Sequence, residues 1–326
     1  MNQGADRVEF SPVLGRPIRQ GTFSELSVSD RERVLQAIEA RDLERLTAYW
    51  AYLSAGQQMM ITLGYEWALR WILETGPEVT AQGHSVFVES LADSVIGRMV
   101  TELLEDPEEL SALADPQTSR LAPHLPQPSP VLEKAQVGDW EGARVLFEGE
   151  FLRAKAWHDL LFRYSYAVMS ALLEKVGQEQ AQAAVERVLR STSFYEPAWQ
   201  QAAAVEPEQL AVMLAEHLRL HFSGPDGGGV EIIEEADRIR LVLSPCGSGG
   251  TMRRQIGHQP GFAKLEQASE VTWGRAGEVP LYCSHCAVNE LESLRRFGHK
   301  KWLTEFDPDP SKPCGWTILK RPTTST

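Results

Sequence analysis

The chain has 326 residues, 43% of them hydrophobic and 24% charged, and a chain of this length has room for about two domains. Its 45 acidic residues against 32 Lys and Arg give a formal net charge of −13. This charge argues against nucleic acid as a partner, because phosphate binding needs a basic surface. The first residues, MNQGADRVEF, do not form a signal peptide, and no apolar run reaches the roughly 18 residues that cross a bilayer. We therefore expect a cytoplasmic protein without a membrane partner.

The first third of the chain predicts an N-terminal arm followed by helices. Residues 1–28 show no clear periodicity, so we predict an arm there. Ser29 and Glu32 have the spacing of a capping box, which opens the first helical half, residues 29–118. Within this half the apolar-rich stretch from Met59 to Leu73 predicts a buried helix, and a further helix is expected over about Val86 to Leu104.

Proline and glycine divide the remainder of the chain. Four prolines between residues 123 and 130 predict a linker over 119–130, because proline interrupts a helix. Helical patterning returns over 131–222, and a glycine-rich linker follows over 223–229. Residues 230–233 and 239–243 alternate as the two strands of a β-hairpin, which opens a module over 230–320 ahead of a tail at 321–326.

The two helical halves resemble each other at several matching positions. Asp42 has a counterpart in Asp139, residues 73–76 in 173–177, and Pro107 in Pro207, in the same order and at an offset near 100. The pattern favours an internal duplication, although amphipathic helices of similar composition also align easily. The predicted fold is therefore mainly α with a C-terminal α+β module: a duplicated helical bundle followed by a small Cys-rich metal-binding domain.

All four cysteines fall in the final module, and their setting predicts a metal site. Cys283 and Cys286 form a C-x-x-C pair that opens a predicted helix over residues 287–297, where the helix dipole favours thiolates. Cys246 and Cys314 each stand between proline and glycine, a sequence typical of a tight turn. Four thiolates suit tetrahedral zinc, which is the favoured cofactor.

Other interpretations of the cysteines stay open. Four cysteines also suffice for an iron–sulfur cluster, and Cys283 with Cys286 could form a redox dithiol. The thiols could also carry no ligand. A closed four-cysteine site is usually structural, whereas a catalytic zinc keeps one position open for water.

The second helical half carries a separate candidate for acid–base chemistry. His158 lies on an apolar face of the predicted helix, next to Asp159 and six residues before Tyr164. We predict that His158 is the acid–base group and that Asp159 orients its imidazole. Tyr164 is a third catalytic candidate. The alternative is a core histidine bonded to a backbone carbonyl. His217 and His221 share one face of the last helix, a geometry that can bind a metal but that the helix dipole alone also favours.

These motifs resemble those of a set of uncharacterised bacterial proteins. The matching residues are His158, Asp159 and Tyr164, then the PCGSGG turn at 245–250, then the YCxHC motif at 282–286. That set is distantly similar to L-2-amino-thiazoline-4-carboxylate hydrolase-type proteins, which implies ring-opening hydrolysis of a small amide-like substrate. The PCGSGG turn also looks like the start of the SEC-C zinc motif, but the paired Cys-Cys or Cys-His that should follow is absent.

The functional expectation is a metal-containing enzyme, with zinc favoured, that acts on a small organic molecule at the junction of the helical bundle and the cysteine module. Hydrolysis is the expected reaction. The first alternative is a small-molecule-binding or regulatory protein whose zinc is purely structural. The second alternative is a thiol-redox or iron–sulfur protein.

Overall fold

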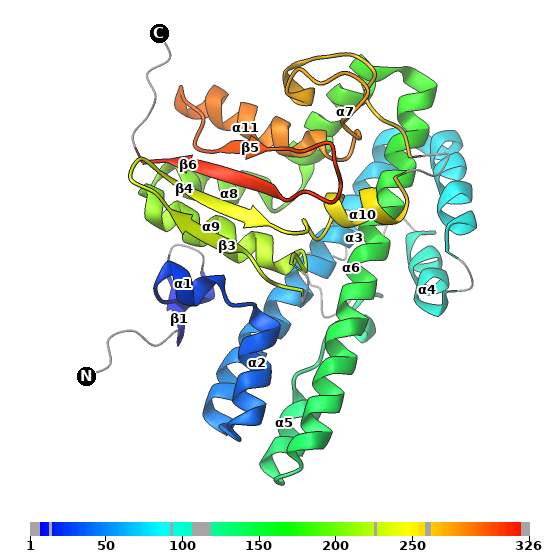
Figure 1. Cartoon of the computed structure of the whole chain (residues 1–326). Helices are drawn as coiled ribbons and strands as arrows, with labels where there is room; N and C mark the ends of the chain where they lie inside the picture. Colours follow the sequence, from blue (N-terminus) through cyan, green and yellow to red (C-terminus); the bar gives the residue numbers. More distant parts are fainter. Residues whose placement is uncertain are drawn as a thin grey trace.

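The computed structural model describes residues 7–12, 15–91, 94–105, 119–224, 227–257 and 262–320. The protein is mainly helical and ends in a small sheet region, as the sequence predicts (Figure 1). The helices are α1 (Phe23–Ser27), α2 (Asp30–Glu39), α3 (Leu43–Glu89), α4 (Val95–Leu104), η2 (Ala122–His124), α5 (Ser129–Gln136), α6 (Trp140–Val176), α7 (Gln178–Ser191), α8 (Tyr195–Ala203), α9 (Pro207–Leu220), α10 (Gly249–Gln255), η3 (Glu270–Thr272) and α11 (Ser284–Phe297). The strands are β1 (Arg7–Ser11), β2 (Arg16–Gln20), β3 (Glu231–Glu234), β4 (Arg238–Leu243), β5 (Leu303–Glu305) and β6 (Cys314–Leu319). No helix among the described residues is long and apolar enough to cross a membrane.

The long helices α3 and α6 pack against each other and form the centre of the bundle (Figure 1). Glycine allows their backbones to approach closely. A Cβ on Gly83 would lie 2.6 Å from the Cα of Val168, and one on Gly64 would lie 3.2 Å from the ring of Phe162. The predicted buried helix over residues 59–73 lies inside α3 and is confirmed.

Breaks in the helices differ in part from the prediction. The helix expected over residues 86–104 is two helices, because α3 ends at Glu89 and Ser94 caps α4 by accepting a hydrogen bond from the Gly97 N–H. Gly76 kinks α3 with φ 75° and ψ 172°, and Gly177 ends α6 with φ 79° and ψ 172°. Both conformations are open to glycine and costly for other residues.

The N-terminal segment is more ordered than the predicted arm. Strands β1 and β2 pair as an antiparallel hairpin, and α1 follows them. The guanidinium of Arg19 is fully buried and donates hydrogen bonds to Asp30 Oδ1 at 2.8 Å and to the Val28 carbonyl at 2.7 Å. Hydrophobic periodicity does not indicate this segment, because the residue that it buries is the charged Arg19. The carboxylate of Asp30 neutralises that charge.

The C-terminal sheet is antiparallel with strand order β3-β4-β6-β5. The predicted hairpin corresponds to β3 and β4, and the strand expected over residues 316–320 corresponds to β6; both are confirmed. Side chains alternate between the two faces of a strand. One face of β4 carries the buried residues Ile239, Leu241 and Leu243, while Arg240 on the other face pairs with Glu305 at 2.8 Å in a partly exposed position. Helix α9 packs against β4 and β6.

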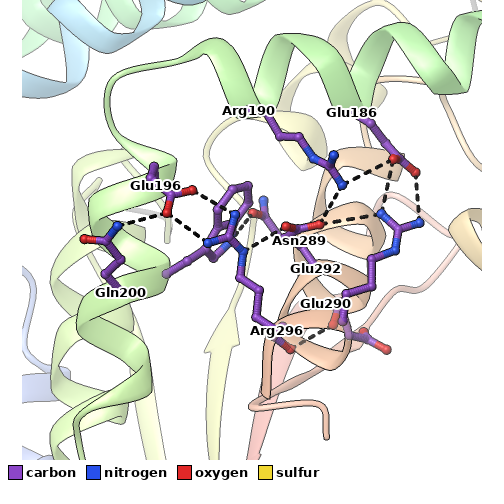
Figure 2. A network of polar contacts seen from close by, with 11 residues as sticks. Glu186, Arg190, Glu196, Gln200, Asn289, Glu290, Glu292 and Arg296 are labelled. Carbon is purple, nitrogen blue, oxygen red and sulfur yellow. Dashed lines mark hydrogen bonds and ion pairs between the residues drawn. The ribbon is translucent and has the colours of Figure 1, made fainter. Parts of the chain in front are cut away.

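Ion pairs join α11 to the helical bundle (Figure 2). Arg296 pairs with Glu196 of α8 at 2.8 Å and with Glu292 of its own helix, and its guanidinium lies over the ring of Trp199. Arg190 of α7 reaches Glu292 at 3.0 Å. Single exposed pairs contribute little, but this network links three helices and so fixes α11 relative to α7 and α8.

Candidate functional site

A cavity of about 600 Å³ lies between helices α3, α8 and α9 and the sheet. This volume is in the range of small-molecule sites, which are usually apolar with a few polar groups. Its lining is largely apolar and includes the aromatic side chains Phe194, Tyr195, Trp199, Trp273, Tyr282, Trp302, Phe306 and Trp316. The cavity is therefore bounded by helices and by the C-terminal sheet.

The sheet contributes alternate residues to this cavity. Cys314 and Trp316 are two apart on β6, and Trp302, Thr304 and Phe306 are two apart along β5 and its ends. Thr304 pairs with Trp316 across the two strands. The period of two in a strand places all of these side chains on one face, so a single sheet face forms one wall of the cavity.

All four cysteines lie on the cavity wall as free thiols. Cys246 follows β4, Cys283 is the residue before α11, Cys286 lies in the first turn of that helix, and Cys314 begins β6. Every pair among the four interacts electrostatically. Burial, together with the neighbouring thiols, raises the pKa of Cys283 and Cys286 and raises that of Cys314 to about 11. Without a cation these thiols are therefore protonated at neutral pH.

The PCGSGG turn brings its backbone against the cysteines. A Cβ on Gly249 would lie 2.9 Å from Cys283 Sγ, and one on Gly250 would lie 3.0 Å from the Cβ of Cys246. Glycine is needed at both positions for this approach. As the side chains stand, no three His, Cys, Asp or Glu residues in the described part of the chain are arranged to hold a metal ion.

A chain of three hydrogen-bonded side chains ends at the cavity. His158 is fully buried in α6, with Nδ1 2.9 Å from Asp159 Oδ1 and Nε2 3.0 Å from Nδ1 of His221. Asp159 in turn pairs with Lys155. His221 follows α9 and lines the cavity, so His158 lies one hydrogen bond behind the cavity wall. We call Asp159, His158 and His221 the histidine chain.

Proton positions in the histidine chain follow from the chemistry of its members. The hydrogen bond to His158 and the charge of Lys155 outweigh burial and lower the pKa of Asp159, which is therefore an ionised acceptor. Burial lowers the pKa of His158, so His158 is neutral, with its proton on Nδ1 and a lone pair on Nε2. That lone pair must accept from Nδ1–H of His221. Burial and the rings of His217, His158 and His285 lower the pKa of His221 as well, which leaves Nε2 of His221 as a free base.

Two further histidines line the cavity. His285 lies between Cys283 and Cys286 in the sequence, with Nδ1 2.5 Å from the Tyr282 carbonyl and Nε2 3.5 Å from Cys286 Sγ. His217 stacks on Phe194, and its ring centre is 5.1 Å from that of His221. The spacing of His217 and His221 was visible in the sequence, but only the fold shows that both reach the cavity.

Tyr164 lies in a different part of the bundle from His158 and Asp159. It is buried against Phe87 and His84 of α3, with ring centres 5.2 and 6.3 Å away. Burial raises its pKa to about 12. The structure thus joins His158 and Asp159 to His221, and it places Tyr164 in the packing between α3 and α6.

No family model, curated protein or solved structure matches this chain. Its function is therefore inferred from the cavity and the side chains around it.

The buried His217 predicts sensitivity to acid. Burial, followed by Arg16 and His285, lowers its pKa from an ordinary 6.5 to about 3. Below pH 6.5 the unfolded chain binds a proton at His217 and the folded chain does not. The free energy of unfolding therefore decreases as the pH is lowered from about 6.5 to 3. Urea unfolding at pH 7, 6, 5 and 4 gives the free energy of unfolding as a function of pH. For His217→Asn the slope of this function should be shallower than for the wild type by up to about 1.4 kcal/mol per pH unit. Parallel slopes for the two proteins would contradict this prediction.

Proposed function

We propose that the protein is an enzyme that binds a small organic molecule in the cavity and hydrolyses it, with His221 as the general base. The observation that carries the proposal is the histidine chain, which presents a neutral imidazole at the cavity and orients it from behind. A base held in one tautomer by a second group is the arrangement that hydrolytic enzymes use to activate water or a nucleophile. The resemblance to L-2-amino-thiazoline-4-carboxylate hydrolase-type proteins supports hydrolysis as the reaction.

In this proposal each member of the histidine chain has its own task. Nε2 of His221 takes a proton from water or from the substrate in the cavity. The positive charge that forms on His221 is shared with His158 through Nδ1–H and is stabilised by the carboxylate of Asp159. His158 and Asp159 are positioning residues, because they act through His221 and do not themselves line the main cavity.

The proposal is tested without a substrate by determining the histidine tautomers. Nitrogen-15 NMR at pH 7 should show His158 and His221 both neutral and both protonated on Nδ1. Asp159→Asn should change the tautomer populations of both rings, because an amide can donate as well as accept. The control is His299→Ala, since His299 lies beside the Phe297 carbonyl and makes no hydrogen bond to the histidine chain among the described residues. Charged rings, or an Nε2–H tautomer at His221, would overturn the assignment of His221 as the base.

We also propose that the four cysteines hold a zinc ion at the cavity wall. Support comes from their number, their shared location, and the raised pKa values of three of them, which a divalent cation would reverse. The cysteine side chains would have to move to bring the sulfurs to zinc, because no three metal-binding residues of the described part of the chain are arranged to hold an ion. When all four coordinate, the site is closed, and zinc supplies folding energy and shapes the wall.

Elemental analysis and thiol counting test the zinc proposal. We expect one zinc per chain and four thiols that react only after chelation. Adding zinc to the apoprotein at pH 7 should release about three or more protons per chain, because the raised pKa values of Cys283, Cys286 and Cys314 mean that these thiols bind zinc only by losing protons. Visible absorption with iron in the preparation would instead indicate an iron–sulfur cluster. Reactive thiols in metal-free, fully folded protein would contradict both metal proposals and favour a redox dithiol at Cys283 and Cys286.

A binding or regulatory protein with a structural zinc is the second candidate. The apolar and aromatic lining of the cavity favours it, because such a lining is sufficient for binding without chemistry. Turnover separates the two candidates: an enzyme converts its ligand and loses this turnover in His221→Ala, whereas a binding protein releases its ligand chemically unchanged.

We further infer that the bundle arose by duplication. Support comes from matching local structure: Asp42 and Asp139 cap α3 and α6 in the same way, and Gly76 and Gly177 break the chain with nearly identical dihedral angles. A histidine and an aspartate at positions 158 and 159 then distinguish the second copy from Ile61 and Thr62 of the first. This difference fits a site that was acquired in one copy only.

A further inference from the structure

Three residues that line the cavity each have a buried polar side-chain atom without a hydrogen-bond partner among the described residues. The indole Nε1 atoms of Trp273 and Trp302 and the hydroxyl of Thr304 are buried and make no hydrogen bond to the described part of the chain. By contrast, Trp199 on the same cavity donates its Nε1–H to Asn289 at 3.2 Å. A buried donor without a partner costs about 1–3 kcal/mol, so several of them on one wall point to a missing acceptor.

Aromatic stacking fixes the orientation of the indole rings of Trp302 and Trp273. Trp302 stacks on Trp316 with ring centres 5.6 Å apart and planes 8° apart. Trp273 stacks on Phe306 at 5.1 Å and 11°, and its backbone is in the left-handed region with φ 50°. Such a conformation is costly for a bulky residue, so the surrounding structure fixes the position of this ring.

The charges around the cavity favour an uncharged ligand. Arg16 and Glu66 are the charged residues among the described part of the lining. Glu66 already accepts hydrogen bonds from the Ser193 backbone and hydroxyl, and Arg16 lies 3.8 Å from Glu216. Glu66 is also paired with Arg70 at 2.6 Å, so an ionised ligand would lose its hydration and would have to compete with these partners for a counter-charge.

We propose that the cavity takes an uncharged, flat aromatic molecule that carries carbonyl-type oxygen acceptors. Its ring packs between the aromatic side chains, and its oxygens accept from the indole N–H groups of Trp273 and Trp302 and from the hydroxyl of Thr304. Indole is a donor only, so these positions select an acceptor and reject a second donor. The proposal names the substrate class of the proposed enzyme and rests on its cavity, but binding of this class does not require hydrolysis.

Three naphthalene probes of similar shape test the ligand class by titration calorimetry. They are 2-acetylnaphthalene, which carries one carbonyl; 2-ethylnaphthalene, which carries none; and 2-naphthoate, which is charged. We expect the ketone to bind about 5–10-fold more tightly than the hydrocarbon, which is the gain from about one hydrogen bond, and the carboxylate to bind more weakly than the ketone. Equal affinities for the ketone and the hydrocarbon, or preference for the carboxylate, would overturn the proposal.

Variants show which groups recognise the carbonyl. Trp302→Phe and Trp273→Phe keep an aromatic ring and remove the N–H, so at least one should lose the preference for the ketone while still binding 2-ethylnaphthalene. Retained hydrocarbon binding shows that the cavity is intact in the variant. The matched control is Trp199→Phe, whose indole N–H is already used by Asn289, and it should keep the preference. If neither Phe variant changes the preference, the indoles are not the recognition groups.

The experiments test the proposed ligand class and the proposed reaction independently. The tautomers of His158 and His221 report on the proposed reaction, whereas the three naphthalene probes report on the ligand class. If the tautomers are as proposed and the ketone shows no advantage, the ligand class is wrong and the acid–base site stands. If the ketone binds selectively and the tautomers differ, the cavity is a binding site of the stated specificity without this base.

Discussion

His221→Ala is expected to reduce kcat by about 10²–10⁴-fold, which is the usual contribution of a general base. The physical reason is that His221 is the member of the histidine chain that reaches the cavity, with a base at Nε2. Asp159→Asn should cause a smaller loss, of at least about tenfold, because the base remains present but its tautomer is no longer fixed.

Turnover can be measured with a panel of aryl esters and anilides, using the best substrate found for the wild type. His299→Ala is the control, because this histidine lies beside the Phe297 carbonyl, outside the proposed site. A rise in KM with kcat unchanged would assign these residues to binding, because removing a group that acts in the transition state lowers kcat. A His221→Ala protein with wild-type kcat would contradict the hydrolytic proposal.

Gly247→Ala is expected to be the most damaging Gly→Ala substitution among the described glycines. A Cβ at this position would lie 1.5 Å from the carbonyl oxygen of His221, which is backbone and cannot rotate away. The Gly247 N–H also donates to the Ser223 hydroxyl at 3.1 Å. The added methyl must therefore separate the PCGSGG turn from the end of α9, and a loss of about 3 kcal/mol or more in unfolding free energy is expected, as for severe overpacking.

Gly149→Ala is the matched control for this substitution. Gly149 lies within α6, and a Cβ there would meet nothing within 4 Å. Alanine is the better helix former by roughly 0.5–1 kcal/mol, so this variant should be slightly stabilised. Urea unfolding followed by circular dichroism gives both values, and equal stabilities for the two variants would contradict the close packing at Gly247.

Local patterns in the sequence were sufficient for much of the fold. The hairpin of β3 and β4 follows from alternation over adjacent residues, and the start of α11 follows from the C-x-x-C pair at its first turn. Such features depend on neighbours in the chain. The split between α3 and α4 was missed because a single capping serine, Ser94, decides it.

The candidate site could be predicted only in part, because its contacts join distant segments. The apolar stripe correctly predicted that His158 is buried, but its partner His221 lies 63 residues away in the chain. Likewise, no local pattern indicates that Trp273 stacks on Phe306, or that Trp302 lacks a hydrogen-bond partner. These features require the folded sheet and bundle together.

The position of Asp159 has a consequence for the way the site exchanges protons with water. Asp159 lines a second, smaller hollow of about 120 Å³, together with Arg163, Ser248, Thr251 and Gln255, while His221 lines the main cavity. The ring of His158 connects Asp159 at the smaller hollow with His221 at the main cavity. A substrate that fills the main cavity therefore does not block proton exchange, because the far end of the histidine chain has its own access to solvent.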